Sequence, residues 1–454
     1  MKDLIIVIFG STGDLTSRKL LPAISRLYKK KELPKETMII ALGRKPISTE
    51  EYLEMVNNQS SQKLDTLGLS KLVTYHHMDV LDFNTYQPLC DMINAEKHEN
   101  TRELYYLALS TELFSDVTNH INKSNLVTIG NLNQSIIFEK PFGHDLFSAK
   151  EINQMLWNYF DEKQIYRIDH YLGKEMIQNI MMVRFANRIF EEIWHNRTIK
   201  SVKIIAKETD GILGRAGYYD QLGALRDMVQ SHLLQILSLV AMEVPVTYHS
   251  DDVKDEKIKV LNHLHFDVDS LILGQYDGYL NEKNIPENST TETFVFFKAY
   301  VNTPRFKGVP FYLMSGKKLD KKESLIEIEF EETSEQRKWN LPLSTNKLFI
   351  KIAPEDGMGL VLNSKVPGLT DNVEPVELEY CVACKAFGNL TEAYEKLIID
   401  IVGQHKTLLT RWDEIELSWH FIDHIKKYQK APIIYKDYAE LKTLIKELTN
   451  EDMK

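Results

Sequence analysis

The sequence predicts an α/β domain over residues 1–168, followed by an α+β domain with a large, mainly antiparallel sheet over residues 169–454. In the first part, apolar strand-like runs alternate with helical patterns, which indicates a parallel sheet covered on both faces. In the second part, strand-like runs follow one another without intervening helices, which is typical of antiparallel pairing. The length of 454 residues also favours two domains, because a single core usually stops growing at a smaller size.

The first domain is expected to begin with a βαβ unit. Its elements are a buried strand at 4–9, a tight turn at 10–13, a helix at 15–31 and a second strand at 38–42. Two later strands are expected at 104–109 and 135–138.

The second domain is expected to combine strands with long helices. Strand-like runs lie at 202–208, 292–300, 309–313, 325–330 and 347–352, and the last helices are expected near 391–402, 412–427 and 438–448. Residues 217–243 include a strongly amphipathic helix. Its apolar stripe consists of Leu222, Leu225, Val229, Leu233, Ile236 and Val240.

Composition excludes several classes of protein. The 55 basic and 65 acidic side chains give a formal charge of −10, which argues against a protein that mainly neutralises nucleic-acid phosphates. No run reaches the roughly 18 apolar residues of a membrane span, and the N-terminal apolar run is too short for a signal peptide, so we expect a cytoplasmic protein. The pair Cys381 and Cys384 lacks a second pair to complete a zinc site, and residues three apart on a strand point to opposite faces. We therefore expect neither a disulfide framework nor a metal site.

The turn GSTGDL lies where the first strand leads into the first helix. Exposed amides and the helix dipole attract a pyrophosphate at such a turn, so the first domain is predicted to be a Rossmann-like dinucleotide-binding domain. The usual third glycine of the fingerprint is absent, and an ordinary strand-to-helix turn is the alternative. The candidate coenzyme residues in this turn are Gly10, Thr12, Gly13, Asp14 and Leu15.

Arg44 and Lys45 follow the second strand, where a fold that prefers NAD would place an acid. Two cations at this point favour a 2′-phosphate and therefore NADP. The alternative is a solvated basic loop.

The segment RIDHYLGKE, residues 167–175, combines an acid, an imidazole, a phenol and an ammonium. If it forms a turn or a helix start, His170 and Lys174 can converge on one anionic group, which suits a phosphate. The alternative is a solvated loop that leads into the next helix.

His232 lies at the edge of the apolar stripe of the amphipathic helix. A histidine in such a position is more often a hydrogen-bonded structural residue than a base. However, Asp227 lies on the same helix, and a polar cluster precedes it, which is typical of a sugar-binding wall. That cluster consists of Arg215, Tyr218, Tyr219 and Asp220.

Taken together, these segments resemble the glucose-6-phosphate dehydrogenase family over nearly the whole chain. The motifs that carry the resemblance appear in the family's order: IFGSTGDLTSRKLLP, YYLAL, EKPFGHDL, RIDHYLGKE, AGYYDQLGALRDMVQSHLLQ, GVPFYLMSGKKL and EAYEKLIIDIV.

The resemblance implies a role for each matching residue. His232 corresponds to the general base, and Asp169 to the carboxylate that orients it. The implied phosphate contacts are His170, Tyr171 and Lys174, and the other implied substrate contacts are Glu208, Asp227, Lys317, Lys322 and Lys140. The implied coenzyme contacts are Gly10, Thr12, Gly13, Arg44, Tyr106 and Lys140, the last lying between substrate and coenzyme.

The implied reaction is the NADP-dependent oxidation of glucose 6-phosphate to 6-phosphogluconolactone, the first step of the oxidative pentose phosphate pathway, by a homodimer or a tetramer. Two alternatives stay open: a dehydrogenase of another sugar or sugar phosphate, and a catalytically silent NADPH-binding regulator. Two departures from the family pattern concern sugar affinity. Ser231 stands where the family has asparagine, and Ala353 where it has glutamine.

Overall fold

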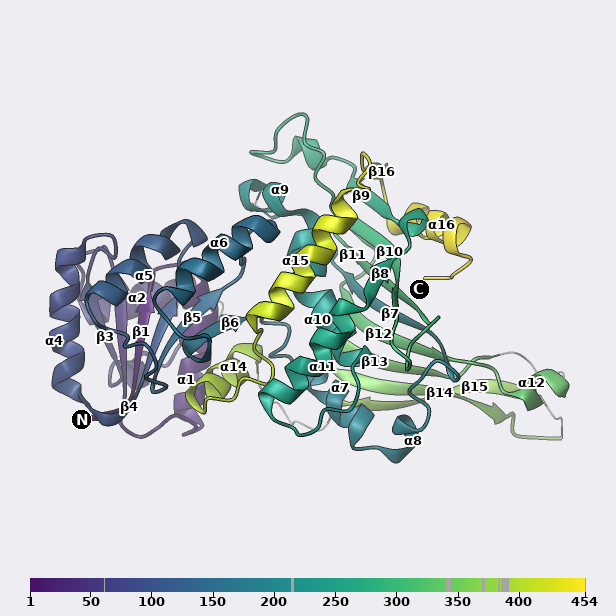
Figure 1. The fold of residues 1–454 in the computed structure, drawn as a ribbon, viewed down its shortest axis with the longest axis horizontal. Coiled ribbons are helices and arrows are strands. Elements are labelled where there is room, and N and C mark those ends of the chain that lie inside the picture. The colour runs from purple at the N-terminus through teal and green to yellow at the C-terminus, as the bar shows by residue number, and fades with distance from the viewer. Residues whose placement is uncertain are drawn as a thin grey trace. The chain divides into compact units, whose positions relative to one another are not determined.

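The computed structural model describes residues 1–60, 62–213, 216–339, 344–369, 372–382, 384 and 392–453. The chain divides into two compact units. Unit 1 consists of Met1–Gly173 and Thr391–Trp412, and unit 2 of Lys174–Leu390 and Asp413–Lys454. Figure 1 labels the elements of both units.

Unit 1 contains a six-stranded, all-parallel sheet with the order β3-β2-β1-β4-β5-β6. This order is that of a doubly wound dinucleotide-binding sheet, so the predicted Rossmann-like fold is confirmed. The strands are β1 (Lys2–Phe9), β2 (Thr37–Gly43), β3 (Val73–His77), β4 (Lys97–Leu107), β5 (Gln134–Glu139) and β6 (Ile165–Ile168).

Helices cover both faces of this sheet, because alternate residues of its apolar strands point to opposite sides. Ile6 and Ile8 of β1 pack in one core and Ile5 and Val7 in another. The first core includes side chains of α1 (Leu21–Lys29), α2 (Thr49–Gln59), the short α3 (Thr66–Leu69) and α14 (Ala393–Val402). The second includes side chains of α4 (Tyr86–Glu96), α5 (Phe114–Lys123) and α6 (Leu146–Trp157).

Helix α14 belongs to unit 1, although the sequence alone placed residues 391–412 in the second domain. Leu397 and Ile401 of this helix are buried in the same core as β1. Its Glu395 accepts hydrogen bonds from Arg26 at 2.6 Å and Lys30 at 2.8 Å. An amphipathic pattern predicts that a helix covers a core, but it does not identify the core, so the return of this segment was not predictable from periodicity.

Unit 2 contains a ten-stranded sheet with the path β15-β14-β13-β12-β7-β11-β10-β9-β16, and β8 pairs with β10. Most neighbours are antiparallel, as predicted, whereas β7–β11 and β9–β16 are parallel pairs. The strands are β7 (Ile199–Lys207), β8 (Leu264–Phe266), β9 (Ile272–Tyr276), β10 (Phe294–Val301), β11 (Pro310–Gly316), β12 (Glu323–Phe330), β13 (Lys347–Ala353), β14 (Gly357–Lys365), β15 (Val373–Cys381) and β16 (Ile433–Tyr435).

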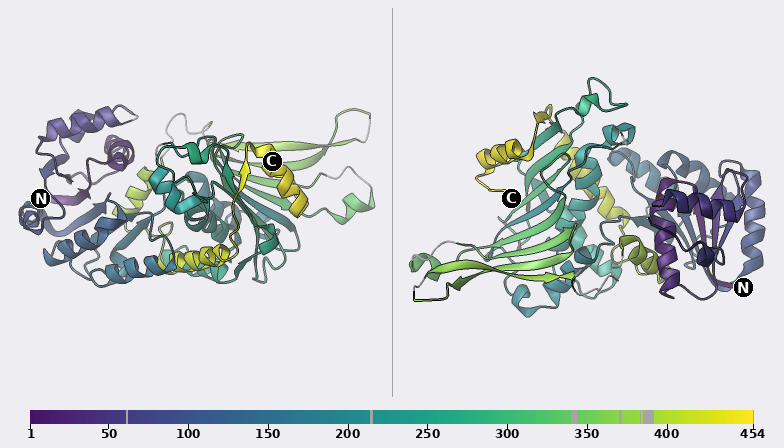
Figure 2. Two further views of the ribbon diagram at one scale, coloured as in Figure 1. Left: turned by 90° about the horizontal axis from the view of Figure 1, so that it is seen from above. Right: turned by 180° about the vertical axis from the view of Figure 1, so that it is seen from behind.

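Helices lie on both faces of the large sheet (Figure 2). One face is covered by α7 (Glu175–Phe185), α10 (Leu234–Ala241), α11 (Ser250–Asn262) and α15 (Trp412–Lys426). On the other face α16 (Tyr438–Thr449) packs its Leu441 and Ile445 against Ile205 and Met314. Among the helices of the described ranges, none combines the length and the apolar composition needed to cross a membrane.

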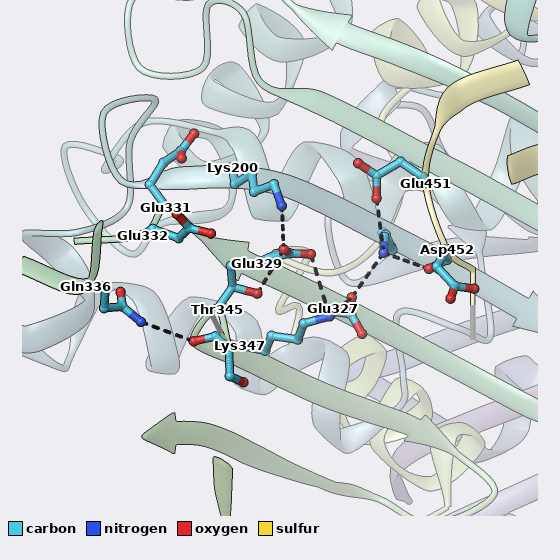
Figure 3. Close-up of polar contacts among 12 residues, drawn as sticks. Lys200, Glu327, Glu329, Glu331, Glu332, Gln336, Thr345, Lys347, Glu451 and Asp452 are labelled. Atoms are coloured by element: carbon cyan, nitrogen blue, oxygen red, sulfur yellow. Dashed lines mark hydrogen bonds and ion pairs between the residues drawn. The ribbon is translucent and has the colours of Figure 1, made fainter. Parts of the chain in front are cut away.

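Charged side chains form a ladder on the α16 face of the sheet (Figure 3). Lys200 pairs with Glu329 at 2.8 Å, and Lys347 pairs with Glu327 at 3.1 Å. Lys203 joins Glu327 to the end of α16, where it lies 3.4 Å from Glu451. Part of this face is therefore charged rather than apolar.

Cys381 and Cys384 form a disulfide, with their Cα atoms 5.3 Å apart. The expectation that these two cysteines lie three residues apart on one strand is wrong, because β15 ends at Cys381. The chain turns instead: the Val382 N–H donates to the carbonyl oxygen of Asp356, and the Cys384 N–H donates to the Cys381 sulfur. The third cysteine, Cys90, is a buried free thiol.

Candidate active site

The predicted coenzyme turn closes tightly on β4. Gly10 has φ +77°, and a Cβ atom there would lie 2.4 Å from the carbonyl oxygen of Ala108, so glycine is required. The Gly13 N–H donates to the Gly10 carbonyl at 3.0 Å. The following residues, Thr16–Leu20, form a π-helix that leads into α1. The turn is thus a narrow cradle at the start of a helix, which fits a dinucleotide pyrophosphate.

The remaining residues of the turn are accessible. Thr12 and Leu15 are half-buried, and Asp14 is exposed and pairs with Arg18 at 2.7 Å. These side chains therefore surround the cradle without filling it.

Arg44 and Lys45 lie directly after β2, and both are exposed. Neighbouring aromatic rings hold their backbone: the Tyr75 hydroxyl donates to the Lys45 carbonyl at 2.8 Å, and His77 Nε2 lies 3.1 Å from the Arg44 carbonyl. A fixed backbone with two exposed cations suits an anionic group, such as the 2′-phosphate of NADP.

Tyr106, at the end of β4, is 3% exposed, and its hydroxyl donates to Glu139 Oε1. Tyr394 of α14 donates to the same oxygen at 3.1 Å. Burial raises the pKa of Glu139 to about 7, although both phenols and Lys140 oppose this shift. The Tyr106 hydroxyl is therefore engaged with Glu139, and the coenzyme contact that the resemblance implies for this residue stays a prediction.

Lys140 and Asp169 follow adjacent strands of the sheet. Lys140 comes directly after β5, is half-buried and precedes a cis peptide bond to Pro141. Asp169 comes directly after β6 and is 4% exposed. Since β5 and β6 are parallel, the two side chains start from the same edge of the sheet.

A turn follows β6 and presents His170 and Tyr171. The Tyr171 N–H donates to Asp169 Oδ1 at 2.9 Å, and the Leu172 N–H donates to the Asp169 carbonyl at 3.1 Å. The His170 and Tyr171 rings meet edge to face, with centroids 5.2 Å apart, and both residues are half-buried. Asp169 therefore fixes the turn that presents both rings.

In unit 2, the predicted amphipathic helix is interrupted twice. Its first part, α9 (Ala216–Ala224), kinks at Gly223, which has φ +68°. Its second part, Leu225–Leu233, is a π-helix that carries Asp227 and His232. Such segments are rare and occur often at functional sites. His232 is 1% exposed, and Arg215, from the predicted polar cluster, lies outside the described residues.

Lys317 and Glu208 form an ion pair in which the Lys317 side chain is 8% exposed. The Lys317 ammonium also lies over the ring of Tyr219, 5.0 Å from its centroid. Burial raises the pKa of Tyr219 well above its usual value, and Asp227 adds to this effect. The structure therefore brings Glu208, Lys317 and Asp227 around one buried phenol.

Lys322 and Lys174 occupy other places in unit 2. Lys322 is exposed, and within the described ranges no contact joins it to the Lys317 cluster. Lys174 directly precedes α7. Burial raises the pKa of Asp356, and the positive charge of Lys174 partly opposes this shift. Ser231 donates to the Asp227 carbonyl at 2.9 Å.

Comparisons with known proteins cover both units. The family model "Glucose-6-phosphate dehydrogenase, NAD binding domain" matches residues 7–179, and "Glucose-6-phosphate dehydrogenase, C-terminal domain" matches residues 181–452. The chain belongs to the glucose-6-phosphate dehydrogenase family.

Relatives of this family match along most of the chain. The glucose-6-phosphate 1-dehydrogenase of Bacillus subtilis is 39% identical over 93% of this chain and 91% of its own length. That of Streptococcus pneumoniae is 40% identical over 93% of this chain and 89% of its own length. A solved glucose-6-phosphate dehydrogenase in complex with glucose 6-phosphate is 34% identical, covers 96% of this chain and 94% of its own, and has a TM-score of 0.89.

Sequence reasoning missed Glu139 and Tyr394 as members of the candidate site. Glu139 was visible only as the first letter of the EKP motif, and Tyr394 only as part of EAYEKL. Their proximity depends on the return of α14 to unit 1, which no local pattern in the sequence indicates.

Proposed function

We propose that this chain oxidises the anomeric carbon of glucose 6-phosphate to the lactone, with NADP as the coenzyme. One observation supports the proposal most strongly: the predicted coenzyme and substrate segments of unit 1 share the carboxyl edge of one parallel sheet. They follow β1, β2, β5 and β6 as the Gly10 turn, Arg44, Lys140 and Asp169. Ligands of open α/β sheets bind outside the carboxyl ends of the strands.

NADP, when bound, supplies the hydride acceptor. The chain's own residues bind and orient the coenzyme and the substrate, and one of them removes a proton from the substrate. The Gly10 turn and Arg44 are proposed to hold the coenzyme phosphates, because the turn lies at a helix start, where the helix dipole favours anions, and Arg44 is an exposed cation. His170, Tyr171 and Lys174 are proposed to bind the substrate phosphate.

His232 is proposed as the general base that takes the anomeric hydroxyl proton. An imidazole titrates near neutral pH, and a positioned base contributes roughly 10² to 10⁴ in rate. The orienting role of Asp169 stays a prediction. Glu208 and Asp227 are proposed to accept hydrogen bonds from sugar hydroxyls, and the ion pair with Lys317 holds Glu208 in place.

The test is the absorbance of reduced coenzyme formed with four substrate pairs: glucose 6-phosphate or glucose, each with NADP or NAD. We expect the highest specificity constant for glucose 6-phosphate with NADP. Equal constants for glucose and its phosphate would reject the phosphate site, and equal constants for the two coenzymes would reject the assignment of Arg44.

We further propose that the protein acts in the cytoplasm as a homodimer that pairs through the large sheet of unit 2. If the α16 face takes part, we expect a polar interface, because this face carries the charged ladder. Lys203, Glu327 and Glu329 already form ion pairs within one chain. Light scattering after size-exclusion chromatography distinguishes a monomer, a dimer and a tetramer.

A further inference from the structure

Glu139 is held by two phenols that come from distant parts of the sequence. Tyr106 and Tyr394 both donate to Glu139 Oε1, and the two phenols are 3% and 8% exposed. Buried hydroxyls are retained where they have partners, since an unpaired buried polar group is unfavourable. The three residues therefore form one hydrogen-bonded unit behind the carboxyl edge of the sheet.

The position of Tyr394 is set by the docking of α14. The next residue, Glu395, has a fully buried side chain that accepts hydrogen bonds from Arg26 and Lys30 of unit 1. Leu397 fills the adjacent core. The Tyr394 hydroxyl is thus brought to Glu139 by a helix that is anchored independently.

Two charged groups act on the Glu139 carboxyl besides the phenols. Lys140, its neighbour in sequence, favours the ionised form, whereas Asp169 disfavours it. Burial is the largest influence and raises the pKa of Glu139 to about 7. The carboxyl therefore changes charge near neutral pH, beside two residues that the proposed reaction uses.

We propose that Glu139 is a positioning residue whose ionised form anchors Lys140, and that the hydroxyls of Tyr106 and Tyr394 hold the Glu139 carboxyl in this role. The inference rests on the proposed function, in which Lys140 lies between substrate and coenzyme. The ionised carboxylate attracts the Lys140 ammonium, and the protonated carboxyl does not. Productive turnover then requires two deprotonated groups, Glu139 and His232.

The experiment is the pH dependence of kcat/KM over the acid limb for the parent protein and three variants. If both groups must lose a proton, the logarithm of kcat/KM rises in the parent with a slope approaching about two per pH unit. Glu139→Gln keeps an oxygen that accepts both phenols but cannot ionise, so the slope should fall to about one. A purely structural role would leave the slope unchanged, and that result would overturn the inference.

Tyr394→Phe provides the second readout. It removes one donor to the carboxylate, so the ionisation assigned to Glu139 should move upward by about one pH unit, a tenfold effect. Tyr105→Phe is the matched control, because Tyr105 neighbours Tyr106 on β4 and its hydroxyl donates to a different acid, Glu103, at 2.6 Å. Equal shifts in the two phenylalanine variants would overturn the proposal.

Failure of the proposed function has a separate signature, which is absence of turnover by the parent. In that case the fluorescence of NADPH reports coenzyme affinity against pH without any reaction. Glu139→Gln should flatten this dependence around neutral pH. The same pH dependence in parent and variant would reject the role of Glu139 independently of the substrate.

Discussion

Replacing Glu395 by glutamine should strongly destabilise the protein, because this acid joins α14 to the rest of unit 1. Its side chain is fully buried and lies 2.6 Å from Arg26 Nε and 2.8 Å from Lys30 Nζ. Burial alone would raise the pKa of Glu395, but Lys30 and Arg26 lower it below its usual value. The ionised form is therefore the stabilising one.

The magnitude follows from the burial of the partners. Breaking a buried ion pair costs about 3–5 kcal/mol. The side chains of Arg26 and Lys30 are 24% and 35% exposed, and solvent can stabilise these cations after the change. We therefore expect the free energy of unfolding of Glu395→Gln to fall by about 2–3 kcal/mol.

Urea denaturation of the parent and of two variants measures this loss. Glu392→Gln is the matched control, since Glu392 contacts the same Arg26 at 2.9 Å but is 42% exposed, and its loss should cost at most about 1 kcal/mol. Because the folded pKa of Glu395 is lowered, its contribution is present above the unfolded pKa and is lost as the pH falls through the folded value. Equal losses in both variants, or a loss from Glu395→Gln that persists undiminished in acid, would refute this reasoning.

Three further predictions concern activity. His232→Asn should lower kcat by about 10² to 10⁴ while NADPH binding, followed by fluorescence, is retained; unchanged turnover would eliminate His232 as the base. Arg44→Ala should raise the KM for NADP by about 10- to 100-fold and leave that for NAD nearly unchanged, as steady-state kinetics can measure. Lys317→Met should raise the KM for glucose 6-phosphate at least about tenfold, because Glu208 loses its cation. The same change at exposed Lys322 should have less effect, and equal effects would contradict the difference in their surroundings.

Much of the fold of unit 1 was predictable because its signals are local. The apolar run of β1, the glycine turn and the following helix identify a βαβ unit within about 40 residues. The return of α14 was not predictable, since its partners Arg26 and Lys30 lie more than 300 residues away in the sequence. The contact is long-range, and amphipathic periodicity is the same for any core.

Details of the helix hydrogen-bond pattern were also not predictable from the sequence. The helices expected at 15–31 and 217–243 contain the π-helical segments Thr16–Leu20 and Leu225–Leu233, yet their apolar patterns read as continuous α-helix. The predicted stripe was nevertheless correct, because Leu225, Val229 and Leu233 are all buried. Hydrophobic spacing thus identifies the buried face of a helix more reliably than its hydrogen-bond pattern.

From the sequence, a site residue can be proposed where its role depends on one side chain, and not where the role depends on a group of side chains. Arg44 can be proposed as a coenzyme contact from its place after a strand, because an exposed cation needs no other side chain for that role. Glu139 cannot be assigned in this way: its ionisation near neutral pH results from burial, two phenols and the charges of Lys140 and Asp169. If the slope test bears out its role, the pH optimum of this protein depends partly on the docking of α14. Substitutions in the Glu395 anchor would then change the pH profile as well as the stability.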